Sequence, residues 1–342
     1  MEWTKTITLN RTHENIGHER ILVTGGTGFI GSHLVEALVK RGHKVRCIVR
    51  NDGQTRFLEN LGVELVYGGI TEKNALQNAV RGMTAVFHLA GILGRWGVPV
   101  EVYWDTNVKG TRLLLECCAE QGVTRVIYCG SASALGHIEK PPADEDYPGN
   151  PSNVYEQSKA QSEKVVLDYR DKLKVTIIRP EFVYGPGDTH VLRLFKAVKN
   201  RKFLIVGNGK SFLHPTYVGD VIQGLILCFE NRKSIGQVYN IVGERYLTVE
   251  DLISMISRNF GLEMHARHIP SWGANFIAST SELAGRLFGF EPVLTKSRVE
   301  FFTVNKAFDS SKARRELGYN PIKLEDGIAD TIKWYLEKGY LD

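Results

Sequence analysis

The amino-acid sequence predicts an α/β protein: a doubly wound parallel β-sheet with helices on both faces, followed by a smaller, mostly helical C-terminal lobe. Short apolar segments alternate with segments of helical periodicity from residue 20 to about residue 180, as in repeated βαβ units. The first apolar segment leads directly into a glycine-rich turn and a helix. With 342 residues, 43% of them hydrophobic, the chain can form one large domain or two smaller ones.

Each element follows from its residue pattern. Short runs rich in β-branched and apolar residues predict strands at residues 21–24, 44–49, 63–67, 84–89, 125–129 and 175–178. Helical periodicity predicts helices at residues 29–41, 72–80, 102–121 and 154–169. Right-handed crossovers between such strands give a doubly wound sheet that binds ligands at the carboxyl ends of its strands.

After residue 180 the alternation ends. A helix is expected at 217–229 and a strand at 237–242, which we expect to rejoin the sheet. The sequence therefore predicts a polar N-terminal arm (1–19) and a dinucleotide-binding Rossmann domain (20–180, rejoined by about 213–243). A substrate-binding lobe is expected from residues 181–212 and 244–342.

Composition excludes several classes of protein. The net charge of +5 is dispersed, with no basic stripe of the kind that binds nucleic acid. The five cysteines form no CxxC pair and no histidine cluster has metal-ligand spacing, so we expect no metal site and a reducing, cytoplasmic location. No apolar run is long enough for an integral membrane segment. Apolar residues across 272–290 favour a substrate lid over a subunit interface or a membrane-surface helix.

Residues 25–31 read Gly-Gly-Thr-Gly-Phe-Ile-Gly, between the first strand and its helix. Glycines let the backbone approach a pyrophosphate, and the N-terminus of the helix offers N–H groups and a positive dipole end. An ordinary glycine-rich turn is the alternative. The context favours a dinucleotide cofactor.

The end of the second strand selects between cofactors. Val49 stands where an acidic residue would bind the ribose of NAD, and Arg50 follows it. A guanidinium there, with Arg46 earlier on the strand, suits the 2′-phosphate of NADP. We therefore expect NADP, while Asp52 leaves NAD possible.

Ser131, Tyr155 and Lys159 have the chemistry that hydride transfer requires. Tyr155 and Lys159 are four residues apart on one helical face, and Ser131 follows the fifth strand. A nearby ammonium stabilises tyrosinate and lowers the pKa of the tyrosine, and a serine hydroxyl orients the substrate oxygen. A surface Tyr–Lys pair and a turn serine are the alternative.

These residues belong to a longer series of motifs. They lie at residues 24–31, 87–91 (Phe-His-Leu-Ala-Gly), 107–111 (Asn-Val-Lys-Gly-Thr), 130–133, 155–159, 179–188 (Arg-Pro-Glu-Phe-Val-Tyr-Gly-Pro-Gly-Asp), 214–221 and 317–321. As a set they resemble the extended short-chain dehydrogenase/reductase family, also called NAD-dependent epimerase/dehydratase. The resemblance implies that Ser131, Tyr155 and Lys159 are catalytic, and that the protein forms a homodimer.

The motif and the resemblance together assign the cofactor contacts. The expected residues are Gly25, Gly28, Phe29, Ile30, Gly31, Arg50, Ile70, Leu89, Ala90, Gly91, Asn107, Lys159 and Pro180. Three departures matter. Family members commonly have Gly-Asp, with the Asp near adenine, where this chain has Gly68-Gly69-Ile70. Compared with the nucleotide-sugar epimerases, Phe182 replaces an Asn and Lys210 replaces an Arg. This version is more similar to the branch of 3β-hydroxysteroid dehydrogenases and dihydroflavonol reductases.

The expected reaction is reversible oxidation of a secondary alcohol to a ketone in a small-molecule substrate, with NAD(P) and with Tyr155 as acid and base. The candidates for the substrate pocket are Ser131, Trp96, Phe182, Tyr184, His190 and His214. For each of them, ordinary packing is the alternative role. A nucleotide-sugar epimerase or dehydratase that retains NAD is the second hypothesis. A catalytically idle dinucleotide-binding scaffold is the third.

Overall fold

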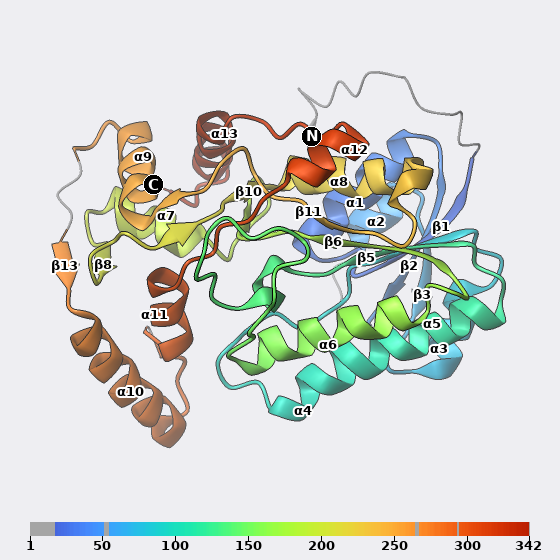
Figure 1. Ribbon diagram of the computed structural model, residues 1–342, viewed down its shortest axis with the longest axis horizontal. Coiled ribbons are helices and arrows are strands. Elements are labelled where there is room, and N and C mark those ends of the chain that lie inside the picture. Colours follow the sequence, from blue (N-terminus) through green and yellow to red (C-terminus); the bar gives the residue numbers. More distant parts are fainter. Residues whose placement is uncertain (1–17, 51–54, 264–266, 293, 342) are drawn as a thin grey trace.

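A computed structural model describes residues 18–50, 55–263, 267–292 and 294–341. Its centre is a seven-stranded parallel sheet, in the order β11-β6-β5-β4-β1-β2-β3 (Figure 1). The strands are β1 (Arg20–Thr24), β2 (Lys44–Val49), β3 (Glu64–Tyr67), β4 (Ala85–His88), β5 (Arg125–Cys129), β6 (Lys174–Arg179) and β11 (Val238–Asn240). The predicted doubly wound α/β fold is confirmed. Residues 1–17 of the predicted arm, and Asp52, lie outside the described residues.

Helices cover both faces of this sheet (Figure 1). On one face lie α1 (Phe29–Lys40), α2 (Arg56–Asn60), α8 (Val218–Glu230) and α12 (Ser311–Leu317), and on the other α3 (Lys73–Val80), α5 (Gly110–Glu120) and α6 (Val154–Asp168). Side chains alternate along a strand, so β1 sends Ile21 and Val23 into the first core and Leu22 into the second. The sheet is therefore buried on both faces.

The predicted helix 102–121 is interrupted. It consists of α4 (Val100–Tyr103), a π-helical turn (Trp104–Lys109) and α5. Isolated π turns inside α-helices are frequent at functional sites.

A second lobe packs beside the carboxyl ends of the strands (Figure 1). It contains β7 (Val183–Tyr184), α7 (Leu192–Lys199), β8 (Leu204–Val206), β9 (Phe212–Leu213), β10 (Thr216–Tyr217), β12 (Leu247–Thr248), α9 (Val249–Asn259), β13 (Arg267–Ile269), α10 (Ser271–Phe288), α11 (Lys296–Thr303) and α13 (Leu324–Glu337). Its strands form three two-stranded sheets, β7 with β10, β8 with β13 and β9 with β12. A core of its own joins α7, α9 and α13.

The two parts are interleaved along the chain. The chain leaves the sheet after β6, builds β7 to β10 of the lobe, and returns with α8 and β11. β11 pairs with β6, and α8 packs against α1. Within the described residues, no helix combines the length and apolar character needed to cross a membrane.

Candidate active site

The glycine-rich turn after β1 is closely packed. Gly25 has φ +75°, and a β-carbon on it would lie 2.8 Å from the backbone nitrogen of Ala90. A β-carbon on Gly31 would collide with the carbonyl oxygen of Gly25. Gly28 caps α1, whose first turn has no acidic residue, and Thr27 and Gly28 are exposed. These residues fit an anionic pyrophosphate, because the exposed end of α1 offers backbone N–H groups and a positive dipole.

A chain of hydrogen bonds supports this turn from below. The Thr24 hydroxyl accepts from the backbone N–H of Ala90 (3.1 Å) and bonds Nδ1 of His88 (2.7 Å). Nε2 of His88 bonds the Thr111 hydroxyl (2.9 Å), which donates to the carbonyl of Asn107 (2.6 Å). Burial, followed by the charge of Lys159, lowers the pKa of His88 to about 3, so the ring stays neutral. His88 was not among the residues predicted from the sequence, although it lies within a motif that was.

Asn107 lies in the π-helical turn and holds the loop of residues 89–99. Its Oδ1 accepts from the N–H of Ile92 (2.8 Å), and its Nδ2 donates to the carbonyl of Ile92 (3.2 Å) and to the Ser158 hydroxyl (2.9 Å). Its own carbonyl accepts from Thr111 and Ser162. The predicted cofactor residues Leu89, Ala90 and Gly91 are thereby tied to α6.

Ser131, Tyr155 and Lys159 come together at the carboxyl end of β5. Ser131 begins a 3₁₀ turn (Ala132–Leu135), and its hydroxyl is hydrogen-bonded with Tyr155. Tyr155 lies in the first turn of α6, which Asn153 caps by accepting from the N–H of Glu156 (3.0 Å). Lys159 follows one helical turn later, with its ammonium buried.

Lys159 is fixed by residues of β5. Its ammonium donates to the Tyr128 hydroxyl (3.1 Å) and the Cys129 carbonyl (2.9 Å), and lies 4.8 Å from the centre of the Tyr128 ring. Burial alone would lower the pKa of Lys159, but Tyr128, Tyr155 and Cys129 outweigh it and hold this pKa above its ordinary value. Lys159 therefore keeps its proton. Tyr128 was missed from the sequence because it reads as one more apolar residue of a buried strand.

Burial raises the pKa of Tyr155, while the charge of Lys159 and the hydrogen bond with Ser131 oppose the rise. The pKa of Tyr155 therefore lies above its ordinary value, whereas the charge of Lys159 alone predicts a lower pKa. The sequence shows the charge beside Tyr155 but not the burial around it. Lys159 limits this rise in the pKa of Tyr155.

A buried carboxyl lies beside this site. Glu181 accepts hydrogen bonds from the Ser133 hydroxyl on both oxygens (3.1 and 2.8 Å), and burial raises its pKa, against the charge of Lys306. It follows Pro180, whose carbonyl accepts from the N–H of Ala132 (3.0 Å). The loops after β5 and β6 are thus joined. Glu181 was also missed, although the sequence places it next to a predicted cofactor residue.

The surroundings of Arg46 on β2 contradict its predicted role in binding the 2′-phosphate of NADP. Arg46 is buried, and its guanidinium donates to the carbonyls of Asn78, Ala79 and Arg81 and pairs with Glu64 (2.8 Å). It closes the C-terminal end of α3 and is not available to a 2′-phosphate. Arg50 is exposed at the end of the strand. Ile70 packs over Gly110, at the start of α5.

Trp96 and Phe182 lie on two loops near the candidate site. Trp96 is half-buried in the loop that passes Tyr155, where a β-carbon on Gly94 would lie 3.5 Å from the Tyr155 side chain. Phe182 has φ 37°, a strained backbone of the kind found at functional sites, and its ring lies 5.1 Å from that of Phe301 on α11.

The other pocket candidates have different surroundings. His214 is buried; its Nδ1 accepts from the N–H of Phe308 (3.2 Å), so Nε2 donates to the Gly243 carbonyl (3.2 Å). Both ring nitrogens are used by the backbone, which contradicts a substrate contact. His190 is exposed, and its N–H donates to Asp188 (2.7 Å).

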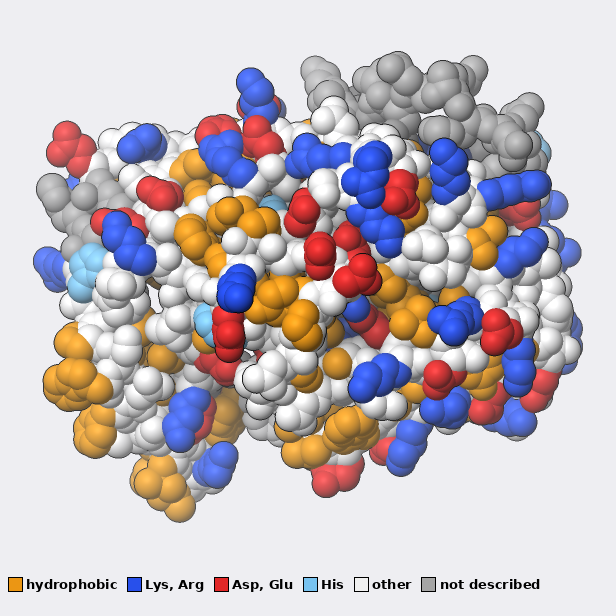
Figure 2. Space-filling model, viewed as in Figure 1, with side chains coloured by type: hydrophobic (Ala, Val, Ile, Leu, Met, Phe, Trp, Pro, Cys, Tyr) orange, Lys and Arg blue, Asp and Glu red, His pale blue; other side chains and the backbone are white. Residues whose placement is uncertain are grey.

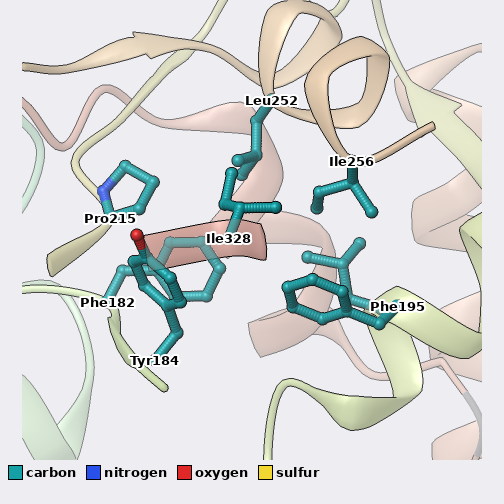
Figure 3. Close-up of a pocket in the computed structure, with 8 residues that line it drawn as sticks. Phe182, Tyr184, Phe195, Pro215, Leu252, Ile256 and Ile328 are labelled. Atoms are coloured by element: carbon teal, nitrogen blue, oxygen red, sulfur yellow. The ribbon is translucent and has the colours of Figure 1, made fainter. Parts of the chain in front are cut away.

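Tyr184 belongs to the interior of the lobe. Together with Phe182 it lines a small apolar cavity between elements of the second lobe (Figure 3). The lining residues are Phe182, Tyr184, Leu194, Phe195, Pro215, Leu252, Ile256 and Ile328. None of Ser131, Tyr155 and Lys159 lines this cavity, and substrate contact by Tyr184 stays a prediction.

Comparisons with known proteins agree with this geometry. The model of the NAD dependent epimerase/dehydratase family matches residues 21–242. Sterol demethylase protein B of Methylococcus capsulatus is 29% identical over 333 residues, which cover 94% of this chain and 99% of that protein. 3beta-hydroxysteroid-dehydrogenase/decarboxylase isoform 1 of Arabidopsis thaliana is 32% identical over 345 residues, covering 91% and 78%.

Solved structures show the same fold. A double mutant of DesIV, a dTDP-glucose 4,6-dehydratase of Streptomyces venezuelae with NAD bound, is 27% identical and has a TM-score of 0.76. The match covers 94% of this chain and 98% of that one. The chain is thus an enzyme of the extended short-chain dehydrogenase/reductase kind and belongs to the NAD dependent epimerase/dehydratase family.

Proposed function

We propose that this enzyme catalyses the reversible oxidation of a secondary alcohol to a ketone, with NADP as its cofactor. The observation that carries the proposal is the joining of Ser131, Tyr155 and a buried, protonated Lys159 at the carboxyl end of β5. The relatives named as sterol enzymes favour an apolar, polycyclic alcohol as substrate.

The residues divide the reaction between them. The nicotinamide ring, when bound, accepts or returns the hydride. The Ser131 hydroxyl orients the substrate oxygen, and Tyr155 takes the hydroxyl proton during oxidation and returns it during reduction. The Lys159 ammonium stabilises the tyrosinate that forms. Asn107 keeps the loop of residues 89–99 against α6.

Changing Tyr155→Phe tests the catalytic assignment. The ring stays in place while the proton carrier is lost, so kcat should fall by about 10²–10⁴-fold. The matched control is Tyr169→Phe, at the far end of the same helix. Calorimetric titration with the cofactor should give similar affinity for both variants. Unchanged turnover in Tyr155→Phe would exclude Tyr155 as acid and base.

Arg50 supports the choice of NADP. Arg50→Ala should weaken NADPH binding by about tenfold or more and leave NADH binding unaltered, because a charged hydrogen bond to the phosphate is lost. Arg56→Ala, on the exposed side of the adjacent helix α2, is the control. An equal effect on both cofactors would remove the reason for preferring NADP.

The second candidate function is that of a sugar-nucleotide epimerase or dehydratase. The similarity of this chain to the NAD-bound dehydratase favours it. Mass spectrometry of nucleotide released from freshly purified, denatured protein separates the two functions. Stoichiometric NAD would support the second candidate and contradict the NADP assignment. A protein that carries no nucleotide and prefers NADPH would support the dehydrogenase.

A further inference from the structure

Helix α10 presents large apolar side chains to the outside of the molecule. Trp272, Phe276, Leu283 and Leu287 are 78, 68, 60 and 71% exposed. Their spacing of four, seven and four residues places them on one side of the helix, and we call them the α10 face. Figure 2 shows hydrophobic side chains gathered where α10 lies, at the lower left.

The orientation of this helix is fixed by small residues on its other side. Ala274 and Ala278 are fully buried, in a cluster with Val206 of β8 and Val299 of α11. A β-carbon on Gly285 would lie 2.8 Å from the carbonyl oxygen of Phe290. Rotating α10 would push large side chains into this close contact, so the α10 face stays outward. It points away from α11, which contradicts its use as a lid over the site.

The exposed apolar area is at the upper end of what the surface of a monomer carries. The four side chains of the α10 face offer on the order of 600 Å² by the usual size of these residues. The largest apolar patch of a typical monomer is about 300–600 Å² and is often functional. The α10 face is therefore a docking surface.

Exposed cations occur on α10 and on the segments at either end of it. Arg286 belongs to α10, Arg267 to β13 before it and Lys296 to α11 after it. Of the nearby acids, Glu282 accepts from the backbone N–H of Lys296 (2.8 Å), and Glu291 is paired with Arg298 and Arg193. Residues 267–298 carry four Arg or Lys and two Glu, so this segment has a net positive charge and attracts an anionic surface. In a symmetric dimer the same segment would face itself and repel.

We propose that the α10 face docks the enzyme on an anionic lipid bilayer, with α10 lying flat in the interface. An apolar face with Trp and Phe and with cations on the same segment is the pattern of interfacial helices. Eighteen residues extend about 27 Å along the surface.

The docked helix lies close to the proposed active site. α10 packs on α11, where Glu300 accepts a hydrogen bond from Ser152 (2.7 Å) near the start of α6 and Phe301 contacts Phe182. An apolar alcohol dissolved in the bilayer would therefore reach the site from a short distance. This last step alone rests on the proposed function.

Vesicle flotation of the full chain tests the docking. The protein should float with vesicles that contain phosphatidylglycerol, and less with phosphatidylcholine vesicles or at high salt. The triple variant Trp272→Ser, Phe276→Ser, Leu287→Ser should bind about a hundredfold more weakly, because most of the inserting apolar surface is gone. Leu336→Ser, at a 49% exposed position on α13, should bind like the unchanged protein.

Other outcomes would overturn the proposal. Absence of flotation with both vesicle types would exclude a bilayer as the occupant. A second outcome is that sedimentation shows a dimer which the triple variant dissociates, while the same variant binds vesicles as before. That outcome would assign the α10 face to a second copy of the chain. Flotation requires neither cofactor nor substrate, so its failure is distinct from a failure of the proposed oxidation.

Discussion

Lys159 illustrates how single residues set the chemistry of this site. Its ammonium is held by the Tyr128 hydroxyl and the Cys129 carbonyl, and so cannot move away from the carboxyl end of β5. Burial raises the pKa of Tyr155, and Lys159 is the strongest influence in the opposite direction. Lys159 therefore limits how far burial raises the pKa of Tyr155, as the proposed role of this tyrosine requires.

The pH dependence of Lys159→Met follows from this. Without the ammonium, tyrosinate loses its stabilisation and the pKa of Tyr155 rises further. The rise of kcat/KM for alcohol oxidation with pH should therefore move to higher pH, since oxidation needs ionised Tyr155. Reduction needs protonated Tyr155 and should show no such shift at neutral pH. Lys164→Met, exposed on the same helix, is the control. Superimposable oxidation profiles for Lys159→Met and the unchanged enzyme would contradict this role.

The sequence predicted well the strands of the sheet and the helices that cover it. Strand-like and helical periodicity can each be recognised within a short stretch of sequence. The strands of the second lobe, such as β7 and β8, are only two or three residues long and leave no periodic signal. The π-helical turn was read as ordinary helix, since it depends on Thr111 and Ser162 binding the carbonyl of Asn107.

The same limit applies to the candidate site. Ser131, Tyr155 and Lys159 could be proposed from the sequence because Tyr155 and Lys159 lie on one face of a strongly periodic helix and Ser131 follows the fifth strand. Arg46 was misread because its partners are carbonyls at the end of α3, which are distant in the sequence. Tyr128 and Glu181 depend on tertiary neighbours in the same way.

The close packing of the turn between β1 and α1 leads to a prediction for Gly31. Gly31→Ala places a β-carbon against the Gly25 carbonyl and must move α1 away from β1. Such overpacking costs about 1–3 kcal/mol, so cofactor affinity should fall by roughly 10- to 100-fold. Gly273→Ala, in α10, meets its nearest atom at 3.8 Å and should bind cofactor normally. Calorimetric titration of both variants makes the comparison. Equal affinities would show that the turn tolerates the shift.

The segment that follows α11 connects the second lobe with the domain that contains the sheet. Lys306 donates to Glu156 (2.7 Å) and to the Gly136 carbonyl (3.0 Å), and all three groups are buried. The backbone N–H of Lys306 donates to Phe212 in the lobe (2.8 Å). A cation from near the C-terminus thus meets the first turn of α6, beside Tyr155.

Lys306→Met should destabilise the whole protein by about 3–5 kcal/mol, because it leaves the Glu156 carboxylate buried without its partner. The double variant Lys306→Met, Glu156→Gln removes both charges and should recover most of the loss. Denaturant unfolding, followed by tryptophan fluorescence and by circular dichroism, measures both effects. If the double variant is no more stable than the single one, the ion pair is not the cause.

The interleaved path of the chain also constrains its synthesis on the ribosome. A ribosome delivers roughly 5–20 residues per second, from the N-terminus onward. β1 and α1 therefore emerge first, but α8, which covers the apolar side of α1, follows only after β7 to β10. Leu34 and Leu38 of α1, fully buried in the finished protein, must wait uncovered for seconds. The sheet is complete only when β11, which ends at Asn240, has been synthesised and pairs with β6.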